Sequence, residues 1–564
     1  MMEDRFLHYF AVTLSMLVAV VQAQPMDPII NMCVRFDHQS TIKNNTLYID
    51  GGTQTYVPIV NGTQDTGNIA IGYNSALVEI DMSSSWDWRS NISESYINKT
   101  DIPNVESIPV LSRGALFAGQ EDDENIYLYG GTTNYINTSN PGFEAPTSDE
   151  YSLFSWDTNT RNVAQFDIQP GAIWRPSAGA YAEAIDLGLG FYLEGQLNSG
   201  SSTETQVLGD NGFQFLNGMI VLDLNAKTAM NISTAPVGTG SPRIYGFLQY
   251  IPDVGEKGIL VSMGGNDNNG NLLGLDSVDV FNINSLFNND TGSWVKQNTS
   301  GDIPGARVSG CIVMVSAQDN SSHNIYIYGG RGADNEFFDQ VYILSIPSFV
   351  WTMVYEGSSP RFAHTCHLVG KRQMLTVGGV SDVPLGQGPC DYQTKGVNIF
   401  DMSALEFGSV YDANAPPYTV PTPVLLKIGG TPTGGSNVSY PDSFKTLFSK
   451  TSPSNTSAPL PTPPPIPPPI PSSPNHEAAV AGAVIGTLLA ILFILFSLWY
   501  FLYQRLALLR RQRATAEAPP PLPEKDPFYY GRRNELPDGN RYGQEMDGER
   551  EAVELYQPPV ELSS

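Results

Sequence analysis

The sequence predicts an all-β fold in which four-stranded blades close radially into a β-propeller. Three observations predict it: an apolar strand ending in Gly-Gly recurs along the chain, a second β-type segment follows each recurrence, and several of these segments then reach an aromatic residue. A blade of this kind buries one face only against its neighbours, so the repeats are stable once the ring has closed.

The Gly-Gly strands are clearest in two nearly identical segments, NIYLYGG (Asn125–Gly131) and NIYIYGG (Asn324–Gly330). Alternating side chains point to opposite faces of a strand, and glycine lets the chain turn sharply at its end because glycine tolerates positive φ. Further copies end at Gly52, Gly265 and Gly379, and a degenerate copy ends at Gly195.

Each Gly-Gly strand is followed by a second β-type segment, and together the pairs predict six blades. The second segments are ALVEIDM (76–82), YSLFSWD (151–157), MIVLDLN (219–225), DSVDVFNI (276–283), DQVYILSI (339–346) and GVNIFDM (396–402). A further segment, PVLLKIGG (Pro423–Gly430), is interpreted as a strand that either closes the ring or belongs to a seventh blade.

An Arg followed by another strand precedes several of the Gly-Gly strands, as in SRGALFAG, ARVSGCIVMV and PRFAHTCHLV. This Arg, the Gly-Gly strand and the later Tyr, Phe or Trp resemble the kelch repeat. Over residues 33–415 the chain resembles the kelch, galactose-oxidase-like propellers of fungal single-pass membrane proteins. The resemblance implies a propeller that presents variable loops on a fixed scaffold, and hence a non-enzymatic binding function.

Both ends of the chain carry membrane-related signals. Residues 1–23 have an apolar stretch and a small-residue cleavage site, which predict a signal peptide. Residues 478–503 contain no charge and are long enough to span a bilayer. Four arginines follow by position 513, and the positive-inside rule places them in the cytoplasm. We expect a type I single-pass protein of the plasma membrane, with residues 24–448 as an extracellular propeller.

The remaining segments agree with this topology. Residues 449–477 are rich in Pro, Ser and Thr and predict an extended stalk, and residues 504–564 predict a disordered cytoplasmic tail. All Asn-x-Ser/Thr sequons precede the predicted span, where the lumen would allow glycosylation. They are Asn44, Asn61, Asn91, Asn98, Asn137, Asn231, Asn289, Asn298, Asn320, Asn437 and Asn455.

The charge and cysteine content narrow the function further. The net charge of −27 offers no basic excess for a nucleic-acid backbone, so we expect no nucleic-acid partner. Four cysteines precede the predicted span, and in an oxidising compartment they suggest two disulfides. Cys366 and Cys390 flank the last Gly-Gly strand, which favours their pairing. That leaves Cys33 with Cys311 by default, or as free buried thiols.

The resemblance to galactose oxidase implies an alternative, a copper oxidase. Such a site needs two His, two Tyr and a Cys cross-linked to one Tyr near the propeller axis. The His residues after the signal peptide fit poorly, because His364 and His367 are three apart on an expected strand and would face opposite sides. The others are His38, His323 and His476. We therefore expect no catalytic residue, no metal and no cofactor.

The candidate ligand for the propeller is a protein or a glycan. We expect the loops Thr132–Glu150 and Asn198–Asp210 to carry the binding site, with Tyr135 and Phe143 as exposed aromatics. In the tail, Pro520, Pro523 and Lys525 form an SH3-type motif, and a receptor acting mainly through this tail is a further alternative. The spacing of Gly482 and Gly486 leaves a homodimer open.

Overall fold

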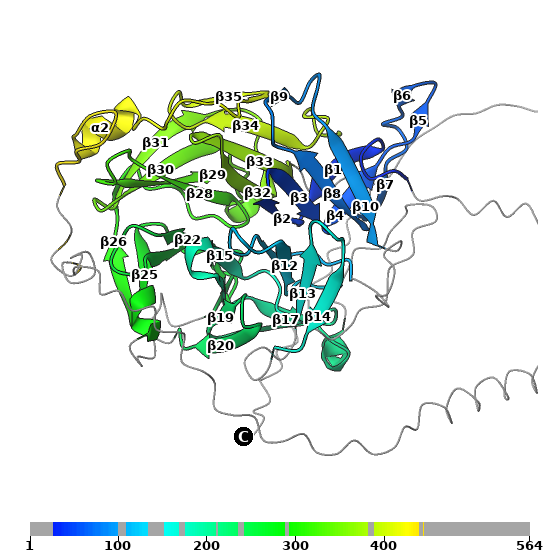
Figure 1. The fold of residues 1–564 in the computed structure, drawn as a ribbon, viewed down its shortest axis with the longest axis horizontal. Coiled ribbons are helices and arrows are strands. Elements are labelled where there is room, and N and C mark those ends of the chain that lie inside the picture. The colour runs from blue at the N-terminus through cyan, green and yellow to red at the C-terminus, as the bar shows by residue number, and fades with distance from the viewer. Residues whose placement is uncertain are drawn as a thin grey trace, which may run out of the picture. The chain divides into compact units, whose positions relative to one another are not determined.

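The computed structural model describes residues 26–99, 109–133, 152–168, 175–209, 212–234, 242–287, 293–381 and 389–438, together with Pro441 and Phe444. All of them lie within one unit, Met1–Pro463. Six sheets are arranged around a common centre, and the blade built from the last strands lies beside the first (Figure 1). The predicted all-β propeller with six blades is therefore confirmed over these residues.

Each blade is an antiparallel sheet whose strands run in chain order from the axis outward. Blades 1 to 3 contain β2 (Gln39–Lys43), β3 (Thr46–Asp50), β8 (Ala76–Asp81) and β10 (Glu94–Asn98); β11 (Ala115–Phe117), β12 (Asn125–Tyr129), β13 (Leu153–Asp157) and β14 (Val163–Phe166); and β15 (Ala180–Ala184), β16 (Leu189–Leu193), β19 (Met219–Asp223) and β20 (Thr228–Ile232).

Blades 4 to 6 repeat the arrangement, with one added parallel strand, β27 (Ser300–Gly301), on blade 5. They contain β22 (Phe247–Ile251), β23 (Ile259–Met263), β25 (Ser277–Asn282) and β26 (Ser293–Asn298); β28 (Cys311–Ser316), β29 (His323–Tyr328), β30 (Gln340–Ile346) and β31 (Val350–Glu356); and β32 (Phe362–Val369), β33 (Gln373–Val380), β34 (Val397–Asp401) and β35 (Glu406–Gly408).

A closed ring of backbone hydrogen bonds joins the six blades just before their innermost strands. One residue per blade has φ between 54° and 61° and donates its N–H to the carbonyl of its counterpart in the preceding blade, at 2.7–3.2 Å. The sixth bond, from Asp37 to Ala363, joins blade 1 to blade 6 and closes the circle. These six residues, called the ring positions below, are Asp37, Arg113, Ala178, Tyr245, Ser309 and Ala363.

The Gly-Gly strand ends explain how one blade meets the next. The first glycine of a pair has φ near 60° and lies so close to the next blade that a Cβ on Gly130 would be 2.4 Å from the Pro176 carbonyl. The second glycine donates its N–H to that neighbour, as Gly131 does to Pro176 at 2.7 Å. Larger residues are disfavoured at the first position by both contact and φ. In blade 3, Glu194 replaces the first glycine, and its carboxylate accepts hydrogen bonds from the backbone N–H and Nε of Arg243.

Blades 6 and 1 are joined by both ends of the propeller sequence. Strand β1 (Met32–Phe36) forms a sheet with β4 (Thr53–Tyr56) and β7 (Ala70–Tyr73) and packs against β33 of blade 6. From the other end, β36 (Val410–Tyr411) pairs with β9 (Trp86–Asp87) of blade 1. Trp88 Nε1 also donates to Asn398 Oδ1 of β34 at 3.3 Å.

The disulfides follow from this closure, and the predicted pairing was wrong. Cys33 is bonded to Cys390, and Cys311 to Cys366. Cys33 lies on β1, which packs on blade 6 and not inside blade 1, so it reaches the connection that contains Cys390. Cys366 lies on the innermost strand of blade 6 and faces Cys311 on the innermost strand of blade 5.

The segment after blade 6 is helical, which corrects the predicted extra strand. Residues Thr422–Ile428 form α2, with Pro421 as its N-cap residue and Pro423 in its first turn. Proline suits the first helical turn, where its missing N–H costs nothing. Val424 and Ile428 pack into the core of blades 5 and 6. No seventh blade forms among the described residues.

The long connections of the blades share one face. Because strands alternate in direction, the ring positions and the Gly-Gly ends lie on one face, called the mouth face, and the other turns lie on the far face. Connections between second and third strands on the mouth face, such as 194–218, are long, whereas the far-face turn 224–227 is short. The mouth face carries β5 (Ile59–Val60), β6 (Thr63–Gln64), β17 (Gln196–Asn198), η3 (Glu204–Leu208), β18 (Phe213–Phe215), β21 (Arg243–Ile244), β24 (Asn266–Asp267) and η5 (Ala333–Asn335).

Short 3-10 turns η2 (Ile185–Leu187) and η4 (Ile283–Phe287) lie on the far face. No helix among the described residues is both long and apolar enough to cross a bilayer. The predicted span 478–503, the stalk, the tail and the signal peptide fall outside the described ranges and stay predictions.

Candidate functional site

A cavity of about 390 Å³ runs along the propeller axis between the innermost strands of all six blades. Its size is in the range of small ligand-binding pockets. The ring positions and the residues next to them line its end on the mouth face, called the entrance below. We take this entrance and the connections around it as the candidate site.

Three ring-position side chains meet at the entrance. Arg113 donates to Asp37 Oδ2 through Nε at 3.0 Å and Nη2 at 2.9 Å, and its guanidinium lies 5.7 Å from the centre of the Tyr245 ring. The Asp37 carboxylate, followed by Tyr245, raises the pKa of Arg113 above its ordinary value. Burial raises the pKa of Tyr245, and Arg113 opposes that shift. The entrance therefore presents a charged pair and a neutral phenol.

The Arg of SRGALFAG differs from the other repeat arginines. Arg307 and Arg361 stand two residues before a ring position and are buried, where they bond to backbone carbonyls at the Gly-Gly ends. Arg113 occupies a ring position itself and is half-buried at the entrance. The repeat Arg thus supports the Gly-Gly ends in blades 5 and 6, whereas Arg113 holds Asp37 at the entrance.

Aromatic and cationic side chains continue outward over blades 5 and 6. Phe337 stacks on Phe362 with ring centres 5.2 Å apart, and the Arg331 guanidinium lies 5.8 Å from the Phe362 ring. Arg331 forms no ion pair among the described residues and acts on Tyr245 through its charge. Tyr392 is 59% exposed. Sequence analysis missed this surface. A signal was present, however, because each ring position lies one residue before a Gly or His at the start of an innermost strand.

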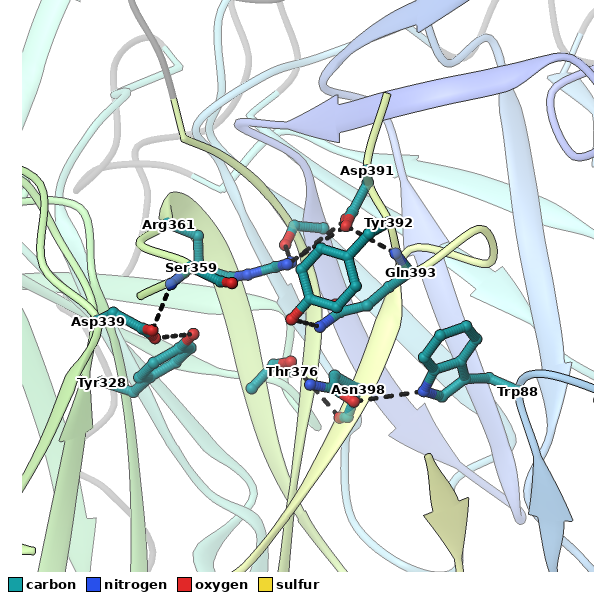
Figure 2. Close-up of polar contacts among 11 residues, drawn as sticks. Trp88, Tyr328, Asp339, Ser359, Arg361, Thr376, Asp391, Tyr392, Gln393 and Asn398 are labelled. Carbon is teal, nitrogen blue, oxygen red and sulfur yellow. Dashed lines mark hydrogen bonds and ion pairs between the residues drawn. The ribbon is translucent and has the colours of Figure 1, made fainter. Parts of the chain in front are cut away.

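Tyr392 is exposed but held in place by a buried network (Figure 2). Gln393 donates to the Tyr392 hydroxyl at 2.7 Å and to Asp391 Oδ1 through its backbone N–H at 3.0 Å. Asp391 pairs with the guanidinium of Arg361 at 3.4 Å. The neighbouring Cys390 is bonded to Cys33. A rigid support of this kind reduces the entropy that an exposed aromatic loses on binding.

The blade 3 connection also presents apolar side chains on the mouth face. In the predicted loop 198–210, Val207 is 89% exposed, and Phe213, just beyond it, is 55% exposed. The base of the connection is fixed, since Thr132 Oγ1 donates to Asn198 Oδ1 at 2.6 Å. Tyr135 and Phe143 lie outside the described residues, as do Pro520, Pro523, Lys525, Gly482 and Gly486.

Inside the cavity, a polar strip joins blades 1 and 6. Ser40 Oγ lies 2.5 Å from Thr365 Oγ1 and 2.7 Å from His367 Nε2, and His38 Nε2 lies 3.1 Å from Thr365 Oγ1. Burial lowers the pKa of His38 to about 3 and that of His367 to about 4, so both are neutral at pH 7. His364 packs against Tyr328 of blade 5, so it points away from His367, as the strand spacing predicted.

Glu183 lines the cavity toward its far end. Its carboxylate accepts the backbone N–H groups of Ala118 at 2.8 Å and Gly119 at 2.7 Å. Burial raises its pKa to about 7, while these bonds and the charge of Lys43 oppose the shift. Through these two hydrogen bonds, Glu183 joins blade 3 to blade 2.

Most of the predicted sequon asparagines that the structure describes are exposed. Among those in the described ranges, Asn98 is half-buried and the others are exposed: Asn44, Asn61, Asn91, Asn231, Asn298, Asn320 and Asn437. Asn137, Asn289 and Asn455 lie outside these ranges. Whether any of them is modified stays a prediction.

Comparisons with known proteins agree with the repeat. Residues 253–419 match the family model described as the KLHDC2/KLHL20/DRC7 Kelch-repeats domain. The chain is 27% identical over 541 residues to a Kelch repeat-containing protein of Arthroderma benhamiae, covering 84% of this chain and 75% of that protein. The solved structure of YjhT aligns with 68% of this chain and all of its own, at 12% identity and a TM-score of 0.44. With its six blades, five of which carry the Gly-Gly pair, the chain has a kelch-type β-propeller fold, and residues 253–419 match a kelch-repeat family.

Proposed function

We propose that this protein is a non-enzymatic interaction propeller whose mouth face binds a segment of a partner protein. The observation that carries the proposal is that long second-to-third-strand connections, among them 51–75 and 194–218, lie on the face that carries the ring positions. On the far face, by contrast, turns such as 158–162, 224–227 and 402–405 reverse the chain in a few residues. Variable connections on a fixed scaffold are where binding sites gather.

The chemistry of the mouth face favours an extended segment with an acidic group flanked by an apolar or aromatic residue. Arg331 offers a guanidinium without an ion pair among the described residues, and Arg113 already holds the carboxylate of Asp37 in the same way. Tyr392 and Phe213 offer exposed aromatic area at low entropic cost. A glycan that stacks on these rings is the other outcome that a screen would reveal.

The proposed setting is the outer surface of a cell. Supporting it are the apolar segment 478–503, the Arg residues after it, the sequon distribution and the Pro-rich stalk. In this setting the tail would recruit cytoplasmic partners, among them an SH3 domain at Pro520–Lys525. A receptor that acts mainly through its tail remains the alternative from the same class.

A galactose-oxidase-like copper site has less support. That chemistry requires a Cys joined to a Tyr near the axis, whereas the two cysteines that line the cavity, Cys311 and Cys366, are bonded to each other. The proposal therefore assigns no catalytic residue to this chain.

The test is a binding screen with the full chain purified in detergent, run against a displayed peptide library and a glycan array. We expect saturable peptide binding that weakens at least tenfold in the double variant Arg331→Gln/Tyr392→Ala. Arg161→Gln is the matched control, because Arg161 is exposed on the far-face turn between β13 and β14. Selected ligands that bind the double variant as tightly as the parent would refute the proposal, and binding to glycans alone would reassign the ligand class.

A further inference from the structure

Three possible metal ligands from two blades meet at the wall of the axial cavity. Cys311 begins β28, while His364 and Cys366 lie on β32, the adjacent innermost strand. One donor atom from each lies within 4.8 Å of the other two. All three residues line the cavity. In the structure, the two sulfur atoms form a disulfide.

The environment of His364 is a second, independent observation. The side chain is 5% exposed, and neither Nδ1 nor Nε2 has a hydrogen-bond partner among the described residues. Buried polar atoms without partners are rare, because each costs the free energy of its lost hydration. The Tyr328 ring touches the imidazole edge-on and supplies no acceptor for it.

We propose that the reduced Cys311–Cys366 pair and His364 form a Zn²⁺ site, so that this disulfide is the oxidised, metal-free state of a redox-dependent metal centre. Two thiolates and one neutral imidazole are a ligand set that Zn²⁺ prefers, and a fourth, tetrahedral position would face the cavity. An imidazole nitrogen that lacks a partner in the disulfide state would then gain one. The cavity supplies the path by which the ion and the reductant reach the sulfur atoms.

The chemical change balances with a dithiol as the reductant. The dithiol gives two electrons and two protons, the Sγ–Sγ bond breaks, two thiols form, and the dithiol becomes a cyclic disulfide. Zn²⁺ then replaces the two thiol protons, which pass to solvent, and bonds to both sulfur atoms and one imidazole nitrogen. A cyclic disulfide that accepts two electrons and two protons reverses the sequence: the Sγ–Sγ bond forms again, the oxidant becomes a dithiol, and the ion is released.

The experiment uses the full chain, reduced with dithiothreitol, freed of the reductant under nitrogen and titrated with Co²⁺ and then Zn²⁺. We expect one equivalent of Co²⁺ with thiolate charge-transfer absorption and tetrahedral d–d bands, displaced by Zn²⁺, and no such bands in the oxidised chain. Cys366→Ser should abolish the signal, and His364→Gln should weaken binding at least tenfold. The double variant Cys33→Ser/Cys390→Ser should retain it.

His364 also packs in the core, so a readout without substitution is needed. In the Co²⁺-loaded parent, a paramagnetically shifted imidazole N–H resonance would report ligation by a histidine. The proposal is overturned if the folded, reduced chain takes up no metal, if His364→Gln binds as tightly as the parent, or if the urea-unfolded chain binds with the same affinity.

Discussion

The two faces of this propeller are built from the same strands but differ in what connects them. On the far face, turns such as 158–162 and 402–405 do little more than reverse the chain. On the mouth face, the ring of backbone bonds and the Gly-Gly contacts repeat from blade to blade, while the side chains at the ring positions and the connections above them do not repeat. Under the proposed function, the repeated backbone contacts and the ligand-binding side chains share one face, in separate layers.

Because the two layers differ in burial and repetition, a substitution in one should affect stability and a substitution in the other should affect binding. The lower layer of the mouth face is buried and repetitive, so changes there should destabilise the fold. The upper layer is exposed and variable, so changes there should leave stability intact. Substitutions on the far face should have only a small effect on stability and none on binding. The predictions below compare matched positions in these layers.

The largest effect is expected for a buried ion pair of the lower layer. Arg243 bonds Glu194 at 3.2 Å and Asp279 at 3.0 Å with all three side chains buried, so Arg243→Met leaves two buried carboxylates without this guanidinium. We expect a loss of about 3–5 kcal/mol in the free energy of unfolding, measured by urea denaturation. The far-face pair of Arg372 with Asp401 is partly exposed, and Arg372→Met should cost about 1 kcal/mol. Equal losses would remove the distinction between the faces.

A glycine pair gives the next comparison. Both Gly130 and Gly270 have positive φ, at 67° and 83°, but a Cβ at Gly130 meets the Pro176 carbonyl whereas one at Gly270 meets nothing within 4 Å. Gly130→Ala should cost about 2–5 kcal/mol, from strain and overpacking together, and Gly270→Ala about 1–2 kcal/mol, from backbone strain alone. Thermal unfolding of the two variants side by side measures the difference. A smaller loss at Gly130 would contradict the proposed blade contact.

The Gly-Gly signal explains how much of the fold was predictable. Because glycine best tolerates the contact that Gly130 makes with the next blade, the pair repeats in five blades and in degenerate form in blade 3, and the six blades could be counted from the sequence. The same signal misled at Gly429 and Gly430, where Pro421 and Pro423 start a helix that happens to end in Gly-Gly. The local sequence could not distinguish a Gly-Gly strand end from a helix that ends in Gly-Gly. The contact that requires the glycine at a strand end is made with a residue of another blade.

The disulfides and the candidate site were less predictable for the same reason. The disulfide between Cys33 and Cys390 depends on the packing of β1 against blade 6. Nothing in the sequence around either cysteine indicates that packing. The entrance depends on residues such as Arg113 and Tyr245, which are far apart in the chain and meet only because the ring closes. Their signal, one residue before the Gly that opens an innermost strand, becomes visible once the repeats are aligned.

The far end of the cavity should show a pH dependence. The pKa of Glu183 is raised to about 7 in the folded state, above its unfolded value. Its contribution to stability is therefore complete below the unfolded pKa and is lost as the pH rises through about 7. The parent should lose stability relative to Glu183→Gln between pH 4.5 and 8, as measured by melting temperatures in matched buffers. A constant difference between the two proteins would contradict the raised pKa.

The smallest effect on stability is expected in the upper layer. Tyr392→Ala removes a side chain that is 59% exposed, so the free energy of unfolding should change by less than about 0.5 kcal/mol. Ligand affinity should nevertheless fall several-fold. Urea denaturation and a binding titration on the same preparation separate the two quantities, and a large loss of stability would place Tyr392 in the lower layer instead.

The most direct test of the account is hydrogen exchange of the full chain, with and without a peptide selected in the screen. We expect backbone amides to exchange more slowly on peptide binding in the mouth-face connections 194–209, 329–339 and 389–396. We expect no change in the far-face turns 158–162, 224–227 and 402–405. Protection confined to the far-face turns would contradict the claim that the mouth face is the binding surface.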